Sequence, residues 1–383
     1  MEHIYMDNAA TTWPKPDSVY TAVDHFNREL GGNPGRGSHA SSLAAGAVLT
    51  EAREALAQLF NIHDSSQVSF CHNITMAINM AMKGLLKAGD HVLITSMEHN
   101  SVVRPLTALQ RWGVEWTAVP CAPDGSLDPD DMRKALRRET RMIAILHASN
   151  LTGTIMPIRE IGSLARRYEV LFLVDSAQSA GILPLDVEAD NIDILCFAGH
   201  KALFGLQGTG GLYVRPDIIP RTLIEGGTGS LSEALTHPDF MPDHLEAGTH
   251  NMPGICGLLA GISFLQKTGI DVVRQHEQKL CGYIMEGLQE IPGLSIYGPK
   301  DPLKRTAVLP ITIEGMDCGE VAVNLEYEYG IFSRSGLHCT PLAHQTLGTM
   351  KLGLCRLSPG YFNTQQHADT LIRALQTIAR QAK

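Results

Sequence analysis

From about residue 18 to residue 267, short apolar runs of strand length alternate with longer stretches of helical pattern. The strand candidates are residues 67–71, 91–95, 114–119, 142–146, 171–174, 192–197 and 211–214. The helix candidates between them are residues 42–60, 75–87, 102–112, 129–138 and 157–168. Strands that alternate with helices predict an α/β fold, in which helices cover both faces of a mostly parallel sheet.

After about residue 270 the pattern changes. A long helical pattern at 272–290 precedes strand candidates at 294–297, 308–313, 330–333 and 351–357, and a last helical pattern covers 364–382. This order of elements predicts a smaller α+β domain. We therefore expect a large domain of residues 15–268, and a small domain that combines residues 1–14 with residues 269–383.

Composition excludes several classes of protein. The 383 residues, 44% hydrophobic and 19% charged, are those of an ordinary globular chain with room for one large and one smaller domain. A formal net charge of −9 without a Lys/Arg cluster argues against nucleic-acid binding. No apolar stretch approaches membrane-spanning length, and the N-terminus lacks the basic region of a signal peptide. We expect a cytoplasmic protein with no nucleic-acid or membrane partner.

The eight cysteines are scattered, and none forms a C-x-x-C pair. Neither a zinc site nor a dithiol redox site is therefore indicated, and we expect no bound metal. In a reducing compartment most of these thiols should be small, buried apolar residues. Cys339 is set apart by its surroundings, which are described below.

Lys201 and Asp175 each stand at the end of an apolar run, 192–198 and 170–174. The carboxyl ends of parallel strands line the ligand crevice of an α/β sheet. Pyridoxal 5'-phosphate (PLP) needs a lysine for an imine bond and an acid beside its ring nitrogen. A solvated loop lysine and a helix-capping aspartate are the structural alternatives. We favour the cofactor role, because Gln178 follows Asp175 at a spacing that lets it contact the phenolate oxygen of the ring.

Two further residues fit such a cofactor. Residues 70–79 read as a strand end that runs into a helix, where backbone amides bind phosphate and Thr75 could donate from its hydroxyl. His99 follows the strand candidate 91–95, where a histidine could stack on the ring and transfer protons. A capping threonine and an ordinary core or surface histidine would look the same, so neither residue is decisive alone.

Taken together, the motifs resemble the cysteine desulfurases, PLP-dependent enzymes of fold type I in the class V aminotransferase group. The matching segments follow the order of the family along almost the whole chain: residues 5–12, 36–39, 97–100, 147–153, 174–178, 198–201, 225–229, 245–251 and 334–339. The resemblance implies PLP as the cofactor, L-cysteine as the substrate and a protein as the sulfur acceptor. It also implies a homodimer with shared sites.

The resemblance assigns a role to each candidate residue. At the cofactor it implies Lys201 as the imine-forming and proton-moving amine, His99 on the ring face, Asp175 at the ring nitrogen, Gln178 and Asn150 on the phenolate side, Thr75 and His200 at the phosphate, and Thr249 at the phosphate of the neighbouring subunit. At the substrate it implies Arg356 as a bidentate carboxylate clamp, with Arg334, His39 and Asn8 as further contacts. Ala198 departs from the family, which often has serine there, and removes one hydrogen bond to the phosphate.

Cys339 distinguishes the possible reactions. In the resembling enzymes this cysteine attacks the sulfur of the substrate, which leaves a persulfide on Cys339 and alanine as the second product. Arg334 and His338 are close in sequence and are expected to favour the thiolate. An arbitrary cysteine would be a buried structural thiol. No long insertion surrounds Cys339, which resembles the short-loop group, whose members usually need a partner to discharge the persulfide.

The sequence therefore predicts a cysteine desulfurase that supplies sulfur for iron–sulfur clusters or thio-cofactors. A selenocysteine lyase acting on L-selenocysteine would use the same site. Another class V aminotransferase or epimerase is also possible, and it should keep full activity when Cys339 is replaced by alanine. A PLP-binding module without activity is disfavoured, because Lys201, Asp175, His99 and Arg356 are all present.

Overall fold

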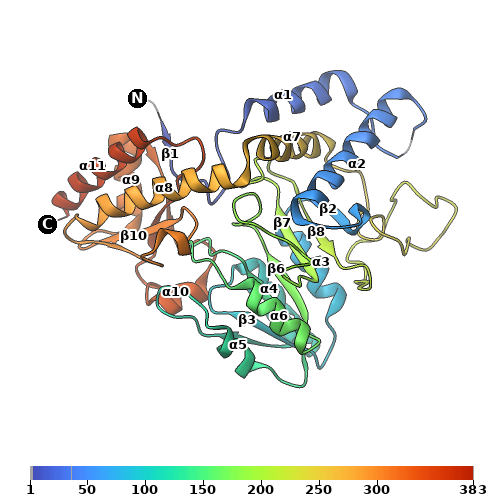
Figure 1. Cartoon of the computed structure of the whole chain (residues 1–383), viewed down its shortest axis with the longest axis horizontal. Helices are drawn as coiled ribbons and strands as arrows, with labels where there is room; N and C mark the ends of the chain where they lie inside the picture. The colour runs from blue at the N-terminus through green and yellow to red at the C-terminus, as the bar shows by residue number, and fades with distance from the viewer. Residues whose placement is uncertain (1–2, 36, 383) are drawn as a thin grey trace.

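The structure is a computed structural model that describes residues 3–35 and 37–382. A sheet of seven strands, in the order β2-β8-β7-β6-β5-β3-β4, forms the centre of the larger part of the described chain (Figure 1). Its strands are β2 Val68–Cys71, β3 His91–Thr95, β4 Glu115–Val119, β5 Thr140–Leu146, β6 Leu171–Asp175, β7 Ile194–Ala198 and β8 Gly210–Val214. Strands β3 to β7 pair in parallel, whereas β8 is antiparallel to both β7 and β2. The predicted mostly parallel sheet is confirmed.

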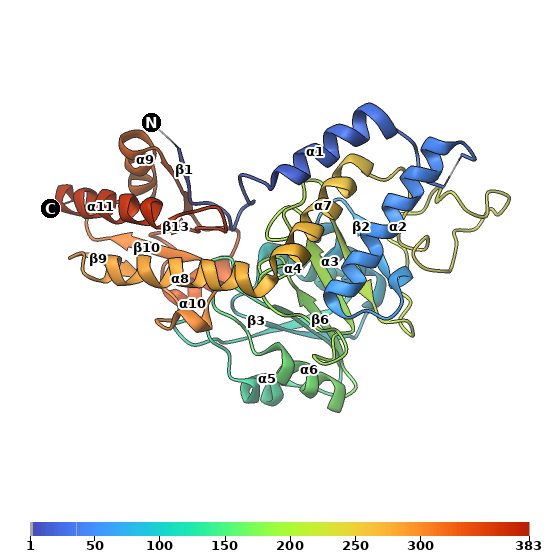
Figure 2. The ribbon, with the colours of Figure 1, turned by 45° about the horizontal axis from the view of Figure 1, so that its top comes forward.

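Helices cover both faces of this sheet. They are α1 Asp17–His25, α2 Ala40–Phe60, α3 Ile74–Leu85, α4 Asn100–Leu109, α5 Pro129–Ala135, α6 Ile158–Arg167 and α7 Met252–Thr268. Helix α7 packs against α1 and α2 (Figure 2), and the sequence did not indicate it. The reason is physical: α7 is apolar around most of its circumference, so it shows no amphipathic period.

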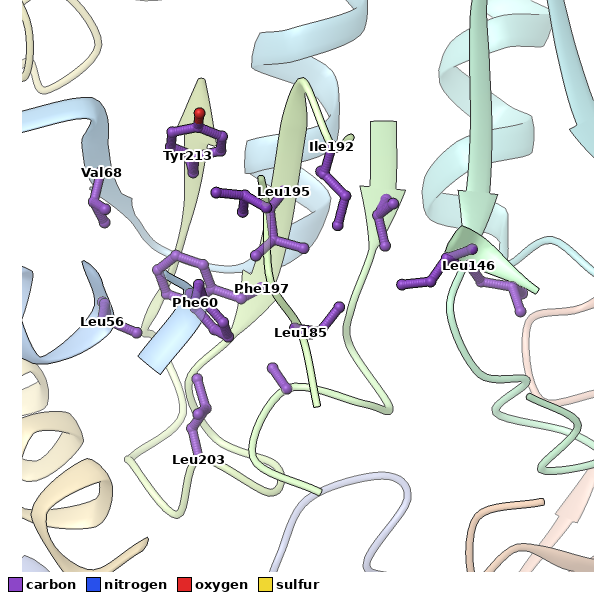
Figure 3. Packing of buried hydrophobic residues seen from close by; sticks show 14 of the residues in the cluster. Leu56, Phe60, Val68, Leu146, Leu185, Ile192, Leu195, Phe197, Leu203 and Tyr213 are labelled. Carbon is purple, nitrogen blue, oxygen red and sulfur yellow. The ribbon is translucent and has the colours of Figure 1, made fainter. Parts of the chain in front are cut away.

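Neighbouring residues of one strand belong to two different core clusters. On β5, Ile143 packs in the cluster that contains α2, α6 and α7, while Met142 packs in the cluster that contains α3 and α4. This alternation is what a sheet buried on both faces requires. Figure 3 shows the first cluster, in which Phe60 of α2 lies against Phe197 of β7 with 5.9 Å between the ring centroids.

The C-terminal part builds a second, antiparallel sheet of four strands in the order β12-β13-β10-β9, as seen in the described residues. Its elements are α8 Ile270–Gln289, β9 Leu294–Ile296, β10 Leu309–Ile313, α9 Cys318–Tyr329, β11 Ile331–Phe332, β12 Arg334–Gly336, α10 Pro341–Leu347, β13 Leu354–Leu357 and α11 Gln365–Gln381. The N-terminal strand β1 Ile4–Tyr5 pairs in parallel with β11, and Ile4 and Met6 pack in the core of this part. Helix α8 joins the two parts (Figure 1).

One predicted strand of this part is shorter than expected, and a second strand, which was not predicted, follows it. We expected a single strand at 330–333, whereas the structure has β11 and β12 on either side of Ser333. The two short strands have different partners, since β11 pairs with β1 and β12 pairs with β13. The pairing with the N-terminal segment is a long-range contact, so local sequence could not indicate the break.

No single helix in residues 3–35 and 37–382 is long and apolar enough to cross a membrane. Helices α7 and α8 would together satisfy the length and composition of a span, but they are bent by 82° at their junction. Most of the apolar side chains of α7 are buried in the core of the larger part.

Candidate active site

Four of the predicted residues follow the carboxyl ends of neighbouring parallel strands. His99 follows β3, Asn150 follows β5, Asp175 ends β6, and Lys201 follows β7. The last residues of β5 and β6 are paired with each other, so these strands end at the same level. The structure therefore brings the four residues to one edge of the sheet, where ligands bind in open α/β folds. We call this place the cofactor edge.

Lys201 and Asp175 form a coupled pair at the cofactor edge. Burial lowers the pKa of Lys201 to about 8, and the charge of Asp175 opposes that shift. Burial also raises the pKa of Asp175 above its usual value, while the Ala177 N–H, which donates to it over 2.8 Å, and the charge of Lys201 work against the rise. The amine of Lys201 is thus available in its nucleophilic form nearer to neutral pH than that of an exposed lysine.

His99 caps α4 and is connected to the start of α3 through Ser101. The Ser101 N–H donates to Nδ1 of His99 over 3.1 Å, and Ser101 Oγ lies 2.8 Å from Oγ1 of Thr75. Because Nδ1 accepts an amide N–H, the proton of the neutral ring is on Nε2. Burial, followed by the positive charge of Lys201, lowers the pKa of His99 to about 4. The ring is therefore neutral at neutral pH, with an N–H to donate.

The N-terminus of α3 lies against the end of β7. Gly210 is the cross-strand partner of Ala198, and a Cβ on Gly210 would come within 2.8 Å of the Asn73 backbone. Asn73 caps the helix by accepting the Met76 N–H over 3.0 Å. The first amides of a helix have no partner inside it, so those of Ile74 and Thr75, which Asn73 does not occupy, can donate to an anion. The structure thus gives Thr75 the surroundings predicted for a phosphate site.

Several buried polar atoms around the cofactor edge have no hydrogen-bond partner in the described chain. They include Nδ1 of His200, Oδ1 of Asn150 and Nε of Arg356. Buried polar groups are nearly always paired in folded proteins. A ligand with a ring hydroxyl, a phosphate and a bound carboxylate would supply partners of the right kind, so the residues present fit PLP together with an amino acid. Within the described residues no cluster of three or more His, Cys, Asp or Glu could hold a metal ion.

Two arginines face each other at the small sheet. Arg334 of β12 and Arg356 of β13 are cross-strand partners. Arg356 is 1% exposed, its Nη2 lies 2.6 Å from Oδ1 of Asp7, and its Nη1 donates to the Asn150 carbonyl over 3.0 Å. Like charges opposite each other destabilise a sheet, and Asp7 balances only one of them. The excess positive charge favours an anionic ligand such as an amino-acid carboxylate.

Cys339 is exposed and lies in a loop between β12 and α10, which we call the Cys339 loop (residues 337–340). His338 and Cys339 have φ angles of 51° and 60°, a region that side chains other than glycine adopt with strain. Asn150 Nδ2 donates to the His338 carbonyl over 2.9 Å, and the Asn100 N–H donates to the Cys339 carbonyl over 2.8 Å. These bonds hold the loop against the segments that follow β5 and β3.

One electrostatic prediction for this loop is wrong. Burial, followed by the charge of Arg356, lowers the pKa of His338 to about 3. The ring is neutral at neutral pH, and its Nε2 lies 3.1 Å from the Arg334 carbonyl, to which it can donate. His338 therefore supplies no positive charge to a thiolate of Cys339, and of the two residues expected to favour the thiolate only Arg334 carries a charge.

Gln178 and Asn8 line one cavity together with Lys201. Gln178 Nε2 donates to the Ala9 carbonyl over 2.8 Å. The amide of Asn8 donates to the Ser358 carbonyl over 3.0 Å, so it joins the N-terminal segment to the small sheet. Both side chains thus lie near Lys201 and also connect separate segments of the chain.

His39 and Thr249 are not brought to the cofactor edge. His39 is exposed and caps α2, where its Nδ1 accepts the Ser42 N–H over 3.2 Å. Thr249 is exposed and lines a different cavity, with His72 and Met76. Arg36, which belongs to the same motif as His39, lies outside the described residues. The roles of His39 and Thr249 stay predictions.

Sequence reasoning did not assign a role to Asp7, which pairs with Arg356, or to Lys15. The Lys15 ammonium is buried, and it donates to Thr12 Oγ1 over 2.6 Å and to the His200 carbonyl over 2.7 Å. Asp7 lies within the recognised motif 5–12, and this was the one feature of the sequence that could have pointed to a role for it. The ion pair joins residues 349 positions apart, so only the fold shows it.

Comparison with known proteins identifies the family of the chain. The family model for aminotransferase class-V matches residues 4–371. A probable cysteine desulfurase of Methanothermobacter thermautotrophicus is 35% identical, over 99% of this chain and 95% of its own length. A cysteine desulfurase of Escherichia coli is 33% identical, over 98% of this chain and 93% of its own. The apo structure of a cysteine desulfurase from Thermococcus onnurineus matches with a TM-score of 0.92 and 29% identity, covering 99% of this chain and 95% of that one.

The chain therefore belongs to the class-V aminotransferase family, whose cofactor is PLP, and its α/β architecture is that of PLP fold type I. Within this family its relatives are cysteine desulfurases.

Proposed function

We propose that the protein is a PLP-dependent cysteine desulfurase, which converts L-cysteine into L-alanine and carries the sulfur as a persulfide on Cys339. The main support is the pair of hydrogen bonds that hold the Cys339 loop, one to the Asn100 N–H and one to Asn150 Nδ2. They keep an exposed thiol beside the cofactor edge, which an aminotransferase or epimerase has no need of. The names of the relatives support the same reaction.

We assign the cofactor contacts as the sequence predicted them. Lys201 would hold PLP covalently, Asp175 would pair with the ring nitrogen, His99 would lie on the ring face, Gln178 and Asn150 would contact the phenolate side, and Thr75 and His200 would hold the phosphate. When bound, PLP supplies an electron sink that weakens bonds to the substrate carbons. The support is the coupled Lys201–Asp175 pair, the capped start of α3 and the unpartnered Nδ1 of His200.

The remaining roles belong to the chain itself. The Lys201 amine, with its pKa near 8, can both take up and return a proton near neutral pH. His99 can donate from Nε2, since Nδ1 is occupied by Ser101. Arg356 and Arg334 would bind the substrate carboxylate, and the excess positive charge of this cross-strand pair supports that role.

The thiolate of Cys339 would attack the sulfur of the bound cysteine. A new S–S bond forms while the carbon–sulfur bond breaks, so Cys339 becomes a persulfide and the carbon skeleton leaves as alanine after protonation. The exposure of Cys339 leaves the outer sulfur open to a second nucleophile, and we propose an acceptor protein as its recipient.

We further propose a homodimer, in which His39 and Thr249 complete the site of the neighbouring copy. Their exposure supports this assembly. We keep the division into a large domain (15–268) and a small domain (1–14 with 269–383). The separate core cluster of the C-terminal part, which contains Ile4 and Met6, supports it.

Incubation of the purified protein with L-cysteine tests the function. Alanine should form, and mass spectrometry should find one added sulfur on the peptide that contains Cys339. Cys339→Ser should bind PLP but form no persulfide and little alanine, whereas Cys121→Ser, a control at a partly buried thiol, should keep both. Undiminished alanine formation by Cys339→Ser would refute the proposal. L-Selenocysteine in a parallel assay separates the lyase alternative.

A further inference from the structure

Glu98 is a buried carboxyl that none of the roles above uses. It is 0% exposed and directly precedes His99. Thr95 Oγ1 donates to Oε1 of Glu98 over 2.6 Å, and the Leu146 N–H lies 3.2 Å from Oε1 and 3.1 Å from Oε2. One side chain thus contacts the last residue of β3 and the last residue of β5.

The contacts of the Glu98 carboxyl replace backbone pairing that is missing between the ends of β3 and β5. β3 extends to Thr95 and β5 to Leu146, but their cross-strand register ends at Leu93 and Ile143. Buried backbone N–H groups need an acceptor, and here the carboxyl of Glu98 takes the place of a carbonyl of β3. The length of the glutamate side chain therefore determines how far apart the two strand ends lie.

Both strand ends lead directly into the cofactor edge. β3 continues into His99, and β5 continues into the turn that contains Asn150. Leu146 is also the cross-strand partner of Asp175, and the His147 N–H donates to the Asp175 carbonyl over 2.9 Å. A shift of Leu146 would therefore move groups on both sides of the proposed ring position.

The charge state of Glu98 fits a bridging role. Burial raises the pKa of Glu98 to about 8; the hydrogen bond from Thr95 opposes the rise, and the charge of Asp175 adds to it. At neutral pH the carboxyl is mostly protonated, so it adds little negative charge beside Asp175. A glutamine at this position would match the neutral acid in length and would still offer one acceptor oxygen.

We propose that Glu98 is a positioning residue of the cofactor site, whose carboxyl sets the separation of the β3 and β5 ends and thereby the placement of His99 and Asn150 on PLP. The inference rests on the proposed PLP site. It adds to that site a residue that acts on the cofactor only through its neighbours.

The test compares three variants at Glu98 with matched variants at Asp193. Glu98→Gln keeps the length of the bridge, Glu98→Asp shortens it by one methylene, and Glu98→Ala removes it. Asp193 is a buried carboxylate that accepts the Phe172 N–H over 2.8 Å, but it precedes β7 and so lies at the opposite edge of the sheet. Asp193→Asn and Asp193→Ala therefore disturb a similar bond far from the proposed cofactor.

The readouts are the absorption spectrum of PLP in the holoenzyme, the rate of PLP release after dilution, and the thermal unfolding midpoint. Glu98→Asp and Glu98→Ala should shift the absorption band and release PLP at least about tenfold faster, while Glu98→Gln stays within about threefold of the wild type. Asp193→Ala should lower the unfolding midpoint but keep the wild-type spectrum and release rate.

A wild-type spectrum and release rate in Glu98→Asp would overturn the proposal, and that variant decides if Glu98→Ala does not fold. A Glu98→Gln variant as impaired as Glu98→Ala would also overturn it, because the bridge length is kept. If Asp193→Ala changed the PLP spectrum and release rate as much as the Glu98 variants do, the effects would reflect general destabilisation and not positioning by Glu98. Wild-type protein that binds no PLP would contradict the proposed function, which is a different result.

Discussion

The cofactor edge and the Cys339 loop are built in opposite ways. At the cofactor edge the groups follow buried parallel strands. Burial lowers the pKa values of Lys201 and His99 and raises that of Asp175, so it favours the uncharged form of each side chain. In the Cys339 loop the thiol itself is exposed, and two of the loop residues have positive φ angles although neither is glycine. Two groups next to the sheet edge, Nδ2 of Asn150 and the Asn100 N–H, hold this strained loop in place.

The difference matches what each region has to do. Chemistry at an amine and a ring is favoured by a dry site with fixed dipoles, which a sheet edge with capped helices provides. Delivery of sulfur to another molecule needs a thiol that the acceptor can reach, which only a surface loop provides. The comparison predicts that substitutions at the edge change cofactor binding, whereas substitutions in the loop change sulfur transfer alone.

The largest expected effect is that of Lys201→Ala at the cofactor edge. Loss of the proton-moving amine should reduce kcat by at least about 10²–10⁴-fold. Borohydride should fix PLP to Lys201 in the wild type and to no residue in the variant. Lys15 is the matched control, since it is also buried and its pKa is lowered to about 7. Cofactor attached to Lys15 would refute the assignment.

The next effect separates the two facing arginines. Arg356→Gln removes a buried, charged hydrogen-bond donor worth about 1.5–3 kcal/mol, which corresponds to a rise in KM for L-cysteine of roughly 10- to 150-fold. Arg334 is more exposed, so Arg334→Gln should raise KM by less than about tenfold. Steady-state kinetics measure both values. A larger rise in KM for Arg334→Gln than for Arg356→Gln would show that Arg334, and not Arg356, is the stronger contact of the substrate carboxylate.

A smaller effect should appear at Gly336, which ends β12 and directly precedes the Cys339 loop. Gly336 has a φ of 107° and free space around its Cα, so Gly336→Ala strains the backbone without a clash. Strain of about 1 kcal/mol should slow persulfide formation roughly fivefold, with an unchanged PLP spectrum. Gly348→Ala is the control, since Gly348 also has a positive φ and open space but ends α10. An altered PLP spectrum in Gly336→Ala would show that a change at the loop also affects cofactor binding, which contradicts the comparison.

The sequence predicted the large sheet because its strands are short, buried apolar runs. It also placed Asp175, Lys201 and His99 at or shortly after the ends of such strands, and Thr75 at the start of a helix, as the structure has them. Helix α7 was missed because a helix buried on most sides has no polar face to reveal its period.

Properties that depend on distant contacts could not be predicted. The Arg334–Arg356 register and the Asp7–Arg356 ion pair join segments far apart in the chain. His338 was expected to favour the Cys339 thiolate, but only the fold shows that its ring is buried, which lowers its pKa to about 3 and leaves it uncharged. The bridge made by Glu98 depends on where the ladder of β3 and β5 stops, which has no local signature.

The smallest expected effect is a dependence of stability on pH, which arises mainly at the cofactor edge. Burial lowers the pKa values of four histidines in or near it, to about 4 for His99 and His200 and to about 3 for His147 and His338. As the pH falls below about 6.5, the unfolded chain binds protons that the folded chain does not, so stability is lost toward acid.

Glu98 has the opposite effect on the pH dependence of stability. Its raised pKa stabilises the folded chain at low pH, and that contribution is lost as the pH rises toward about 8. The thermal unfolding midpoint should therefore be lower at about pH 5 than at about pH 7, and Glu98→Gln should widen the gap because it removes the opposing group. A gap that narrows in Glu98→Gln would mean that Glu98 is ionised in the folded protein, and the cofactor edge would then carry more negative charge than the comparison assumes.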